Sequence, residues 1–178
     1  MILLLLMAFA TPKGWILAGA APSDYEAGVD RKITHSGRAS GLLRAKEMPS
    51  KFGTLMQMFK ADTYRGKRVR LSAWVKSQQV AGWAGVWMRV DGDDSKPLAF
   101  DNMQNRPIKG TSGWQRYEVV LDVADKASAI AFGILLDGAG AVWIDEVRFE
   151  IVDRSVPTTG MSGGSSLPAS PENLDFED

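Results

Sequence analysis

The fold is decided by residues 67–92, which read KRVRLSAWVKSQQVAGWAGVWMRVDG. Apolar side chains occupy every second position on both sides of segment 77–83. Alternation with a period of two predicts two β-strands that each bury one face. The buried sets are Val69, Leu71, Ala73 and Val75 in the first strand, and Ala84, Val86, Met88 and Val90 in the second.

The opposite faces of these two strands carry the large side chains Trp74 and Trp87. If segment 77–83 is a hairpin loop, an antiparallel register places Trp74 opposite Trp87. The same register places Ser72 opposite Arg89, and Arg70 opposite Asp91. Indole rings beside guanidinium groups on one face predict a recognition surface. The alternative is that both rings lie under a loop or under the C-terminal tail and enlarge the core.

Composition limits the classes of protein to consider. A length of 178 residues fits one domain, and 45% apolar with 24% charged residues is ordinary for a globular protein. Twenty-one basic residues balance 21 acidic ones, so the long-range attraction expected of a nucleic-acid-binding protein is missing. The absence of cysteine excludes thiolate catalysis and cysteine-ligated zinc.

The first ten residues form an apolar N-terminal segment. Residues 2–9 are too few to span a bilayer, so we expect no membrane partner. Residues 8–10 resemble an A-x-A cleavage site, although no basic residue precedes the apolar run. The segment is a signal remnant, a buried strand or a cloning scar. We favour the signal remnant, and with it a secreted or periplasmic location over a cytoplasmic one.

Further strands are predicted between turns rich in glycine, aspartate and serine. The change of buried face around Asp145-Glu146 predicts a β-bulge there. Many short strands without helical periodicity predict an all-β antiparallel sandwich. The predicted strands are 15–18, 25–33, 39–45, 53–59, 98–102, 115–123, 127–136 and 141–152, and residues 61–65 fit one helical turn.

Composition divides the chain into four parts. Residues 1–10 are the apolar segment, 11–155 the sandwich, 156–171 a linker rich in proline, glycine and serine, and 172–178 a strand-like tail. In the tail, Leu174 and Phe176 alternate with polar residues, which predicts a strand that folds back onto the sandwich. The tail docks either on its own domain or on a neighbouring copy, which would produce self-association. Alternatively, it is the beginning of a second module.

Several segments of the sequence stand out, and they include GWILAG at 14–19, DYEAGVDR at 24–31, HSGRASG at 35–41, WMRVDG at 87–92 and VWIDEVRFEIVD at 142–153. Together they resemble one jelly-roll group, the carbohydrate-binding modules of the galactose-binding-like superfamily. This group is found as stand-alone proteins and as the accessory domain of AraC-type transcriptional regulators. The resemblance implies a jelly-roll β-sandwich that binds a ligand without catalysis. The 178 residues show no helix-turn-helix pattern, so we expect no nucleic-acid partner.

Carbohydrate recognition needs apolar ring faces for C–H groups and planar polar groups for hydroxyls. The tryptophans can supply the rings. For Asp101 and Asn102, capping of a turn competes with ligand contact as the interpretation. The alternative function is a sensory or protein-interaction domain without a sugar ligand. The predicted ligand-binding residues are Trp74, Trp87, Arg89, Gln57, Asp101, Asn102, Gln104 and Arg106.

Calcium is the candidate cofactor. In the group that this chain resembles, a structural Ca²⁺ often joins an acidic residue of the opening strand to the aspartate of a W-x-D motif. The matching residues here are Glu177 and Asp145. Calcium prefers six or more oxygen ligands, and the sequence supplies only these two. Pairing of Asp145 with a nearby arginine or lysine is the competing interpretation.

Catalysis has little support in the sequence. His35 is the only histidine and lies in a turn of small residues, which favours a structural role. Residues 160–164 match G-x-S-x-G, but they lie in the predicted linker without the strand and helix that a nucleophile elbow requires. We therefore expect a protein that is not an enzyme.

Overall fold

The computed structural model describes residues 11–94 and 96–160, and this part of the chain contains nine β-strands and two short 3-10 turns. No helix among these residues is long and apolar enough to cross a membrane. The strands are β1 (Ile16–Gly19), β2 (Tyr25–Asp30), β3 (Ser40–Ala45), β4 (Gly53–Lys60), β5 (Arg68–Gly92), β6 (Pro97–Asp101), β7 (Ile108–Asp122), β8 (Ala127–Asp137) and β9 (Ala141–Val152). The turns are η1 (Pro22–Asp24) and η2 (Asp62–Tyr64).

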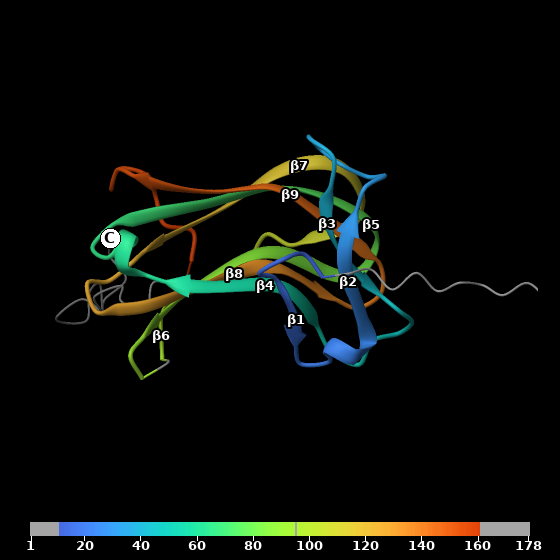
Figure 1. Ribbon diagram of the computed structural model, residues 1–178, viewed down its shortest axis with the longest axis horizontal. Coiled ribbons are helices and arrows are strands. Elements are labelled where there is room, and N and C mark those ends of the chain that lie inside the picture. Colours follow the sequence, from blue (N-terminus) through green and yellow to red (C-terminus); the bar gives the residue numbers. More distant parts are fainter. Residues whose placement is uncertain (1–10, 95, 161–178) are drawn as a thin grey trace, which may run out of the picture.

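The strands form two layers packed face to face, which confirms the predicted jelly-roll sandwich (Figure 1). The first sheet has the order β7-β5-β9-β3-β2, and the second has the order β1-β4-β8-β5-β6. All of these pairings are antiparallel. Apolar side chains from both inner faces make one continuous core that includes Leu71, Ile134 and Val142. The outer faces are left for ligands or partners.

Strand β5 belongs to both sheets, and this overturns the predicted hairpin. Its first part pairs with β7 and β9, and its second part pairs with β8 and β6. Between them the chain bends at Gln79, which has a φ of 51°. A Cβ atom at Gly82 would lie 2.3 Å from the carbonyl oxygen of Asp137, so a glycine lets the β8–β9 turn pack against this bend. The strand therefore crosses between layers instead of turning back.

The predicted cross-strand pairs are wrong for the same reason. Trp74 lies opposite Arg116 of β7 and Asp145 of β9, whereas Trp87 lies opposite Gly133 of β8. The two indoles are therefore on different sheets. The other predicted pairs fail as well, because Ser72 lies opposite Glu118 and Arg148, and Arg70 lies opposite Val120 and Glu150.

The predicted bulge is confirmed in β9. The register against β5 shifts between Ser72 and Trp74, and Glu146 has a φ of 48°. Part of the predicted linker also lies within the described residues, and it is packed instead of free. The backbone N–H of Thr159 donates to the carbonyl of Val120 at 2.9 Å, and Arg68 donates to the carbonyl of Val156 at 2.6 Å.

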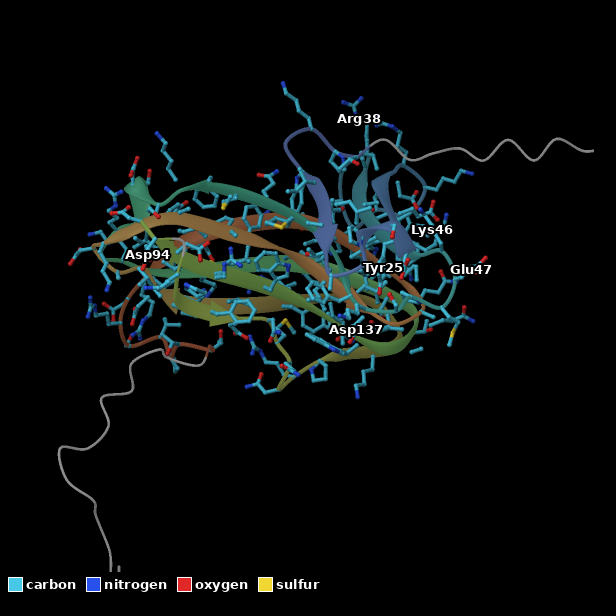
Figure 2. The ribbon with its side chains drawn as sticks, turned by 90° about the horizontal axis from the view of Figure 1, so that it is seen from below. Tyr25, Arg38, Lys46, Glu47, Asp94 and Asp137 are labelled. Carbon is cyan, nitrogen blue, oxygen red and sulfur yellow. The ribbon has the colours of Figure 1, made fainter. Side chains whose placement is uncertain are left out.

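Tyr25 closes one end of the core. Its ring is buried, and its hydroxyl donates to the carbonyl oxygen of Lys51 at 3.0 Å. Burial, together with the nearby carboxylate of Asp137, raises the pKa of Tyr25 to about 12. Figure 2 views the molecule from the side of the second sheet and shows Tyr25 close to Asp137.

Candidate ligand-binding site

The predicted ligand-binding residues lie in separate parts of the molecule. Trp74 lies on the outer face of the first sheet, and Trp87 and Arg89 lie on the outer face of the second. Residues 101–106 form the start of the β6–β7 connection. Gln57 is half-buried on β4 beside Gly14 and makes no hydrogen bond to these groups within the described residues.

On the first sheet, the loop between β2 and β3 covers Trp74. The His35 ring stacks on the indole with the centroids 4.0 Å apart and the planes at 14°. The carboxylate of Asp145 accepts the backbone N–H groups of His35 at 2.9 Å and Ser36 at 3.1 Å. Glu146 lies 2.9 Å from His35 Nδ1. One face of Trp74 is therefore already occupied by the protein, and His35 has a structural role.

A second contact holds the base of the same loop. The indole N–H of Trp143 donates to Asp30 Oδ2 at 2.9 Å, and the backbone N–H groups of Lys32 and Ile33 donate to Asp30 Oδ1. Burial of the carboxylate acts to raise its pKa. The hydrogen-bond donors outweigh this effect and hold the pKa of Asp30 below its ordinary value. The folded protein therefore prefers the ionised carboxylate at this position.

The stability of the protein should consequently depend on the ionisation of Asp30. A lowered pKa in the folded state stabilises the protein above the unfolded pKa of about 4, and this contribution is lost as the pH falls through the folded value. We expect Asp30→Asn to be less stable than the unmodified chain at pH 7. The difference between their urea midpoints should shrink below about pH 4. A gap between the two midpoints that is independent of pH would contradict this role of Asp30.

On the second sheet, Trp87 is buried in a small outer cluster. Its side chain is 7% exposed and packs with Ala131 and Leu135. Its indole N–H donates to Thr54 Oγ1 at 2.8 Å, and the Thr54 hydroxyl donates to the carbonyl of Ile134 at 2.9 Å. Trp87 therefore stabilises this face and is not an open stacking platform. The residues around it belong to its own sheet, whereas the alternative interpretation placed the ring under a loop or the C-terminal tail.

Two large apolar side chains are exposed on this outer face, on strands that are separated by β8 and β5. Met58 is 61% exposed, and Phe100 at the β6 edge is 40% exposed. Arg89 lies opposite Phe100, and its guanidinium binds the carboxylate of Asp91 at 2.8 Å.

A pocket of about 400 Å³ adjoins this face at the β6–β7 connection. It brings together three of the predicted residues and three further ones, and one of the latter, Phe100, is 40% exposed. The lining residues are Phe100, Asp101, Asn102, Gln104, Asn105 and Thr159.

Asp101 holds the residues around the pocket in place through its hydrogen bonds. Its carboxylate is buried and accepts three hydrogen bonds. The donors are the guanidinium of Arg106 at 2.6 Å, the hydroxyl of Thr159 at 2.5 Å and the backbone N–H of Met103 at 2.8 Å. Asn102 Oδ1 accepts the backbone N–H of Gln104 at 3.1 Å. Both Asp101 and Asn102 thus cap the turn. Arg106 also donates to the carbonyl of Glu118 at 3.0 Å, so it fastens the loop to β7.

The free hydrogen-bonding capacity of the pocket lies in its amides. Among the described residues, nothing bonds to the Gln104 side chain or to the amide nitrogens of Asn102 and Asn105. Each amide combines donors and an acceptor in one plane. Together with the open Phe100 ring, they can bind a ligand that has an apolar face and several hydroxyl groups.

Of the two predicted calcium ligands, only Asp145 lies within the described residues. Both oxygens of Asp145 accept N–H groups, from His35, Ser36 and Glu146, instead of pairing with an arginine or lysine. These donors compete with a cation for the same lone pairs. The described residues contain no group of three His, Cys, Asp or Glu side chains able to hold a metal ion. Glu177 lies outside the described residues, so calcium stays a prediction.

Sequence reasoning missed three pocket residues and one contact. Phe100 and Asn105 stand inside the amide-rich stretch 100–106 and could have been chosen from it. Thr159 lies within the predicted linker, 58 residues after Asp101 in the sequence. No local pattern indicates that the two residues are in contact. The stacking of His35 on Trp74 likewise joins distant segments and has no local signal.

Comparisons with known proteins agree with this architecture. No family model matches the chain. It is 48% identical over 168 residues to YbfP of Bacillus subtilis (strain 168), described as an uncharacterized HTH-type transcriptional regulator. The match covers 93% of this chain and 57% of YbfP. The chain therefore spans somewhat more than half the length of that relative.

Solved structures share the fold at low sequence identity. The CBM22-1 xylan-binding domain of Xyn10C from Paenibacillus barcinonensis matches with a TM-score of 0.57 and 14% identity, over 82% of this chain and 90% of that one. The Stig cyclase Fisc from Fischerella sp. TAU matches with a TM-score of 0.53 and 16% identity, over 82% and 89%. One of these neighbours binds xylan and the other is an enzyme, so the shared fold does not fix the function.

Proposed function

We propose that the protein is a non-catalytic module that binds a carbohydrate or a similar polyhydroxylated ligand in the pocket at residues 100–105. The observation that carries this proposal is that one pocket is lined by amide groups with free hydrogen-bonding capacity and by a partly exposed phenylalanine. Planar polar groups beside an aromatic ring match the hydroxyl and C–H surfaces of a sugar.

The charges around the pocket favour a neutral ligand. Asp101 is neutralised by Arg106 and saturated by its hydrogen bonds, so neither group is available to pair with an ionic ligand. Arg89 is similarly paired with Asp91. The groups left for recognition are the amides, which carry no charge. The xylan-binding domain among the structural neighbours supports this ligand class.

The similarity to YbfP supports a second, compatible role. A chain that matches part of a transcriptional regulator at 48% identity is suited to a sensory domain whose ligand changes the behaviour of the regulator. If no saccharide binds, an interaction domain of such a system is the function that this similarity favours.

The test is a glycan array followed by titration calorimetry with the strongest ligand. Gln104→Ala or Asn105→Ala should weaken binding about five- to tenfold, because each removes a hydrogen bond. Phe100→Ala should weaken it at least about tenfold. Gln78→Ala and Met58→Ala are matched controls, as they remove an exposed amide and an exposed apolar chain elsewhere. Equal losses in controls and pocket variants, or no glycan binding at all, would contradict the proposal.

A further inference from the structure

We propose that the sandwich has an open strand position beside β9, and that residues 173–177 of the same chain fill it. The proposal concerns a place remote from the amide pocket and does not depend on the proposed function. It rests on a cavity, an unpaired strand edge and a set of incompletely covered apolar side chains.

The cavity lies where β3 ends its pairing with β9. It has a volume of about 260 Å³ and opens onto core residues, among them Leu55 and Ile144. A cavity of about 150 Å³ can hold a benzene ring, so this one has room for a ring and a smaller aliphatic chain. Trp15, Asp145, Glu146 and Val147 also line it.

The strand edge belongs to the second half of β9. Residues 141–144 pair with β3 on one side and β5 on the other. From residue 145 to residue 152, β9 pairs with β5, and no other described strand pairs with its second edge. An edge of this kind presents backbone N–H and C=O groups that can accept an added strand.

The inward-facing side chains along this edge are not fully covered. Val147 and Phe149 are half-buried, and Ile151 is 54% exposed. Phe149 packs edge-on against Phe59 and Phe132, with centroids 5.3 Å and 4.8 Å apart. A strand along β9 would complete the cover over this aromatic group and would remove apolar surface from water.

Residues 173–177 have the pattern that such a position needs. Leu174 and Phe176 are two residues apart, so in a strand they point to the same face about 7 Å from each other. That face can enter the cavity, while Asn173, Asp175 and Glu177 face solvent. The apolar run at residues 2–9 lacks this alternation and would expose every second apolar side chain.

The tail is long enough to reach this edge. The described chain ends at Gly160, which packs against the carbonyl of Phe100. Twelve residues separate it from Asn173, and an extended chain covers up to about 3.5 Å per residue, or about 40 Å in all. This is close to the diameter of a domain of about 150 residues.

The charges near the cavity are already balanced. Asp145 accepts backbone N–H groups, and Glu146 is paired with His35 at 2.9 Å and Arg148 at 3.2 Å. The acidic side chains of the segment would point outward, where Arg148 is well exposed. Docking therefore buries no uncompensated charge.

The test compares the thermal unfolding of four chains: residues 1–178, residues 1–160, the full chain with Leu174→Ser and Phe176→Ser, and the full chain with Leu167→Ser. We expect the truncated and doubly substituted chains to lose at least about 5 °C in Tm. Leu167→Ser removes a leucine outside the alternating pattern and should leave Tm unchanged. Equal Tm values for all four chains would overturn the proposal.

Two measurements locate the docking site. The amides of residues 147–152 that do not bond to β5 should exchange more slowly in the full chain than in residues 1–160. A peptide of residues 171–178 should raise the Tm of residues 1–160, and a peptide with both serine substitutions should not. Unchanged exchange would place the tail elsewhere and would overturn the assignment.

The source of the strand is tested by dilution. A strand from the same chain gives a Tm and a sedimentation coefficient that do not change with protein concentration. A strand supplied by a second copy would make both depend on concentration, and this result would overturn the assignment to the same chain.

Discussion

Replacing Trp87 with alanine should lower the free energy of unfolding by about 3–5 kcal/mol, as large-to-small changes at buried aromatic residues do. The indole fills the outer cluster of the second sheet with Ala131 and Leu135, and its N–H bonds to Thr54. Chemical denaturation monitored by circular dichroism measures the loss. Gly133, which lies opposite the indole, has no side chain that could fill the vacated space.

Two comparisons separate packing from hydrogen bonding at Trp87. Trp87→Phe keeps much of the ring but removes the N–H donor, so we expect a smaller loss of about 1–2 kcal/mol. Trp74→Ala should cost less than Trp87→Ala, since Trp74 lies on the other sheet and is only half-buried. A Trp87→Ala chain with unchanged stability would show that the ring is not part of the packed structure.

Replacing Asp101 with alanine should destabilise the protein by about 2–4 kcal/mol and also remove ligand binding in the adjacent pocket. The carboxylate is buried and joins Arg106, Thr159 and the backbone of Met103. Without it, Arg106 loses its partner and the loop loses its connection to residue 159. Denaturation and calorimetric titration measure the two effects.

Asp94→Ala provides the matched control, since this aspartate is exposed in the β5–β6 turn and pairs with Lys96 on the surface. Its stability should change by less than about 0.5 kcal/mol, and its binding should be unaffected. Loss of stability in Asp101→Ala with full retention of glycan binding would separate the carboxylate from the site.

Local sequence patterns were sufficient to predict most of the secondary structure. Alternation of apolar residues predicted β8 and β9 to within one residue at each end. The reversal of the buried face at Asp145-Glu146 predicted the bulge, because a single inserted residue must exchange the two faces. The first part of β7, residues 108–114, was missed, as its glycines and polar residues lack alternation.

The pairing of the strands was not predictable in the same way. Alternation on both sides of segment 77–83 is identical whether the chain turns back or continues into a second layer. The choice depends on contacts between distant residues, in particular the N–H of Ala81 donating to the carbonyl of Ala139 at 3.0 Å. A short-range pattern contains no information about that contact.

The same limit applies to the site. The density of amides in residues 100–106 was visible in the sequence, and the structure places most of these residues on one pocket. The sequence did not indicate how exposed the two tryptophans are. Exposure depends on His35, which stacks on Trp74, and on Thr54 and Leu135, which contact Trp87. Patterns identify which residue types are available, whereas tertiary contacts decide which of them remain free.

Because β5 is an interior strand of both sheets, unfolding it would break strand pairings in both layers at once. Denaturation should therefore be all-or-none, with no state in which one layer survives alone. The two faces of the molecule, although chemically unlike, are held in a fixed mutual orientation by a single uninterrupted length of backbone.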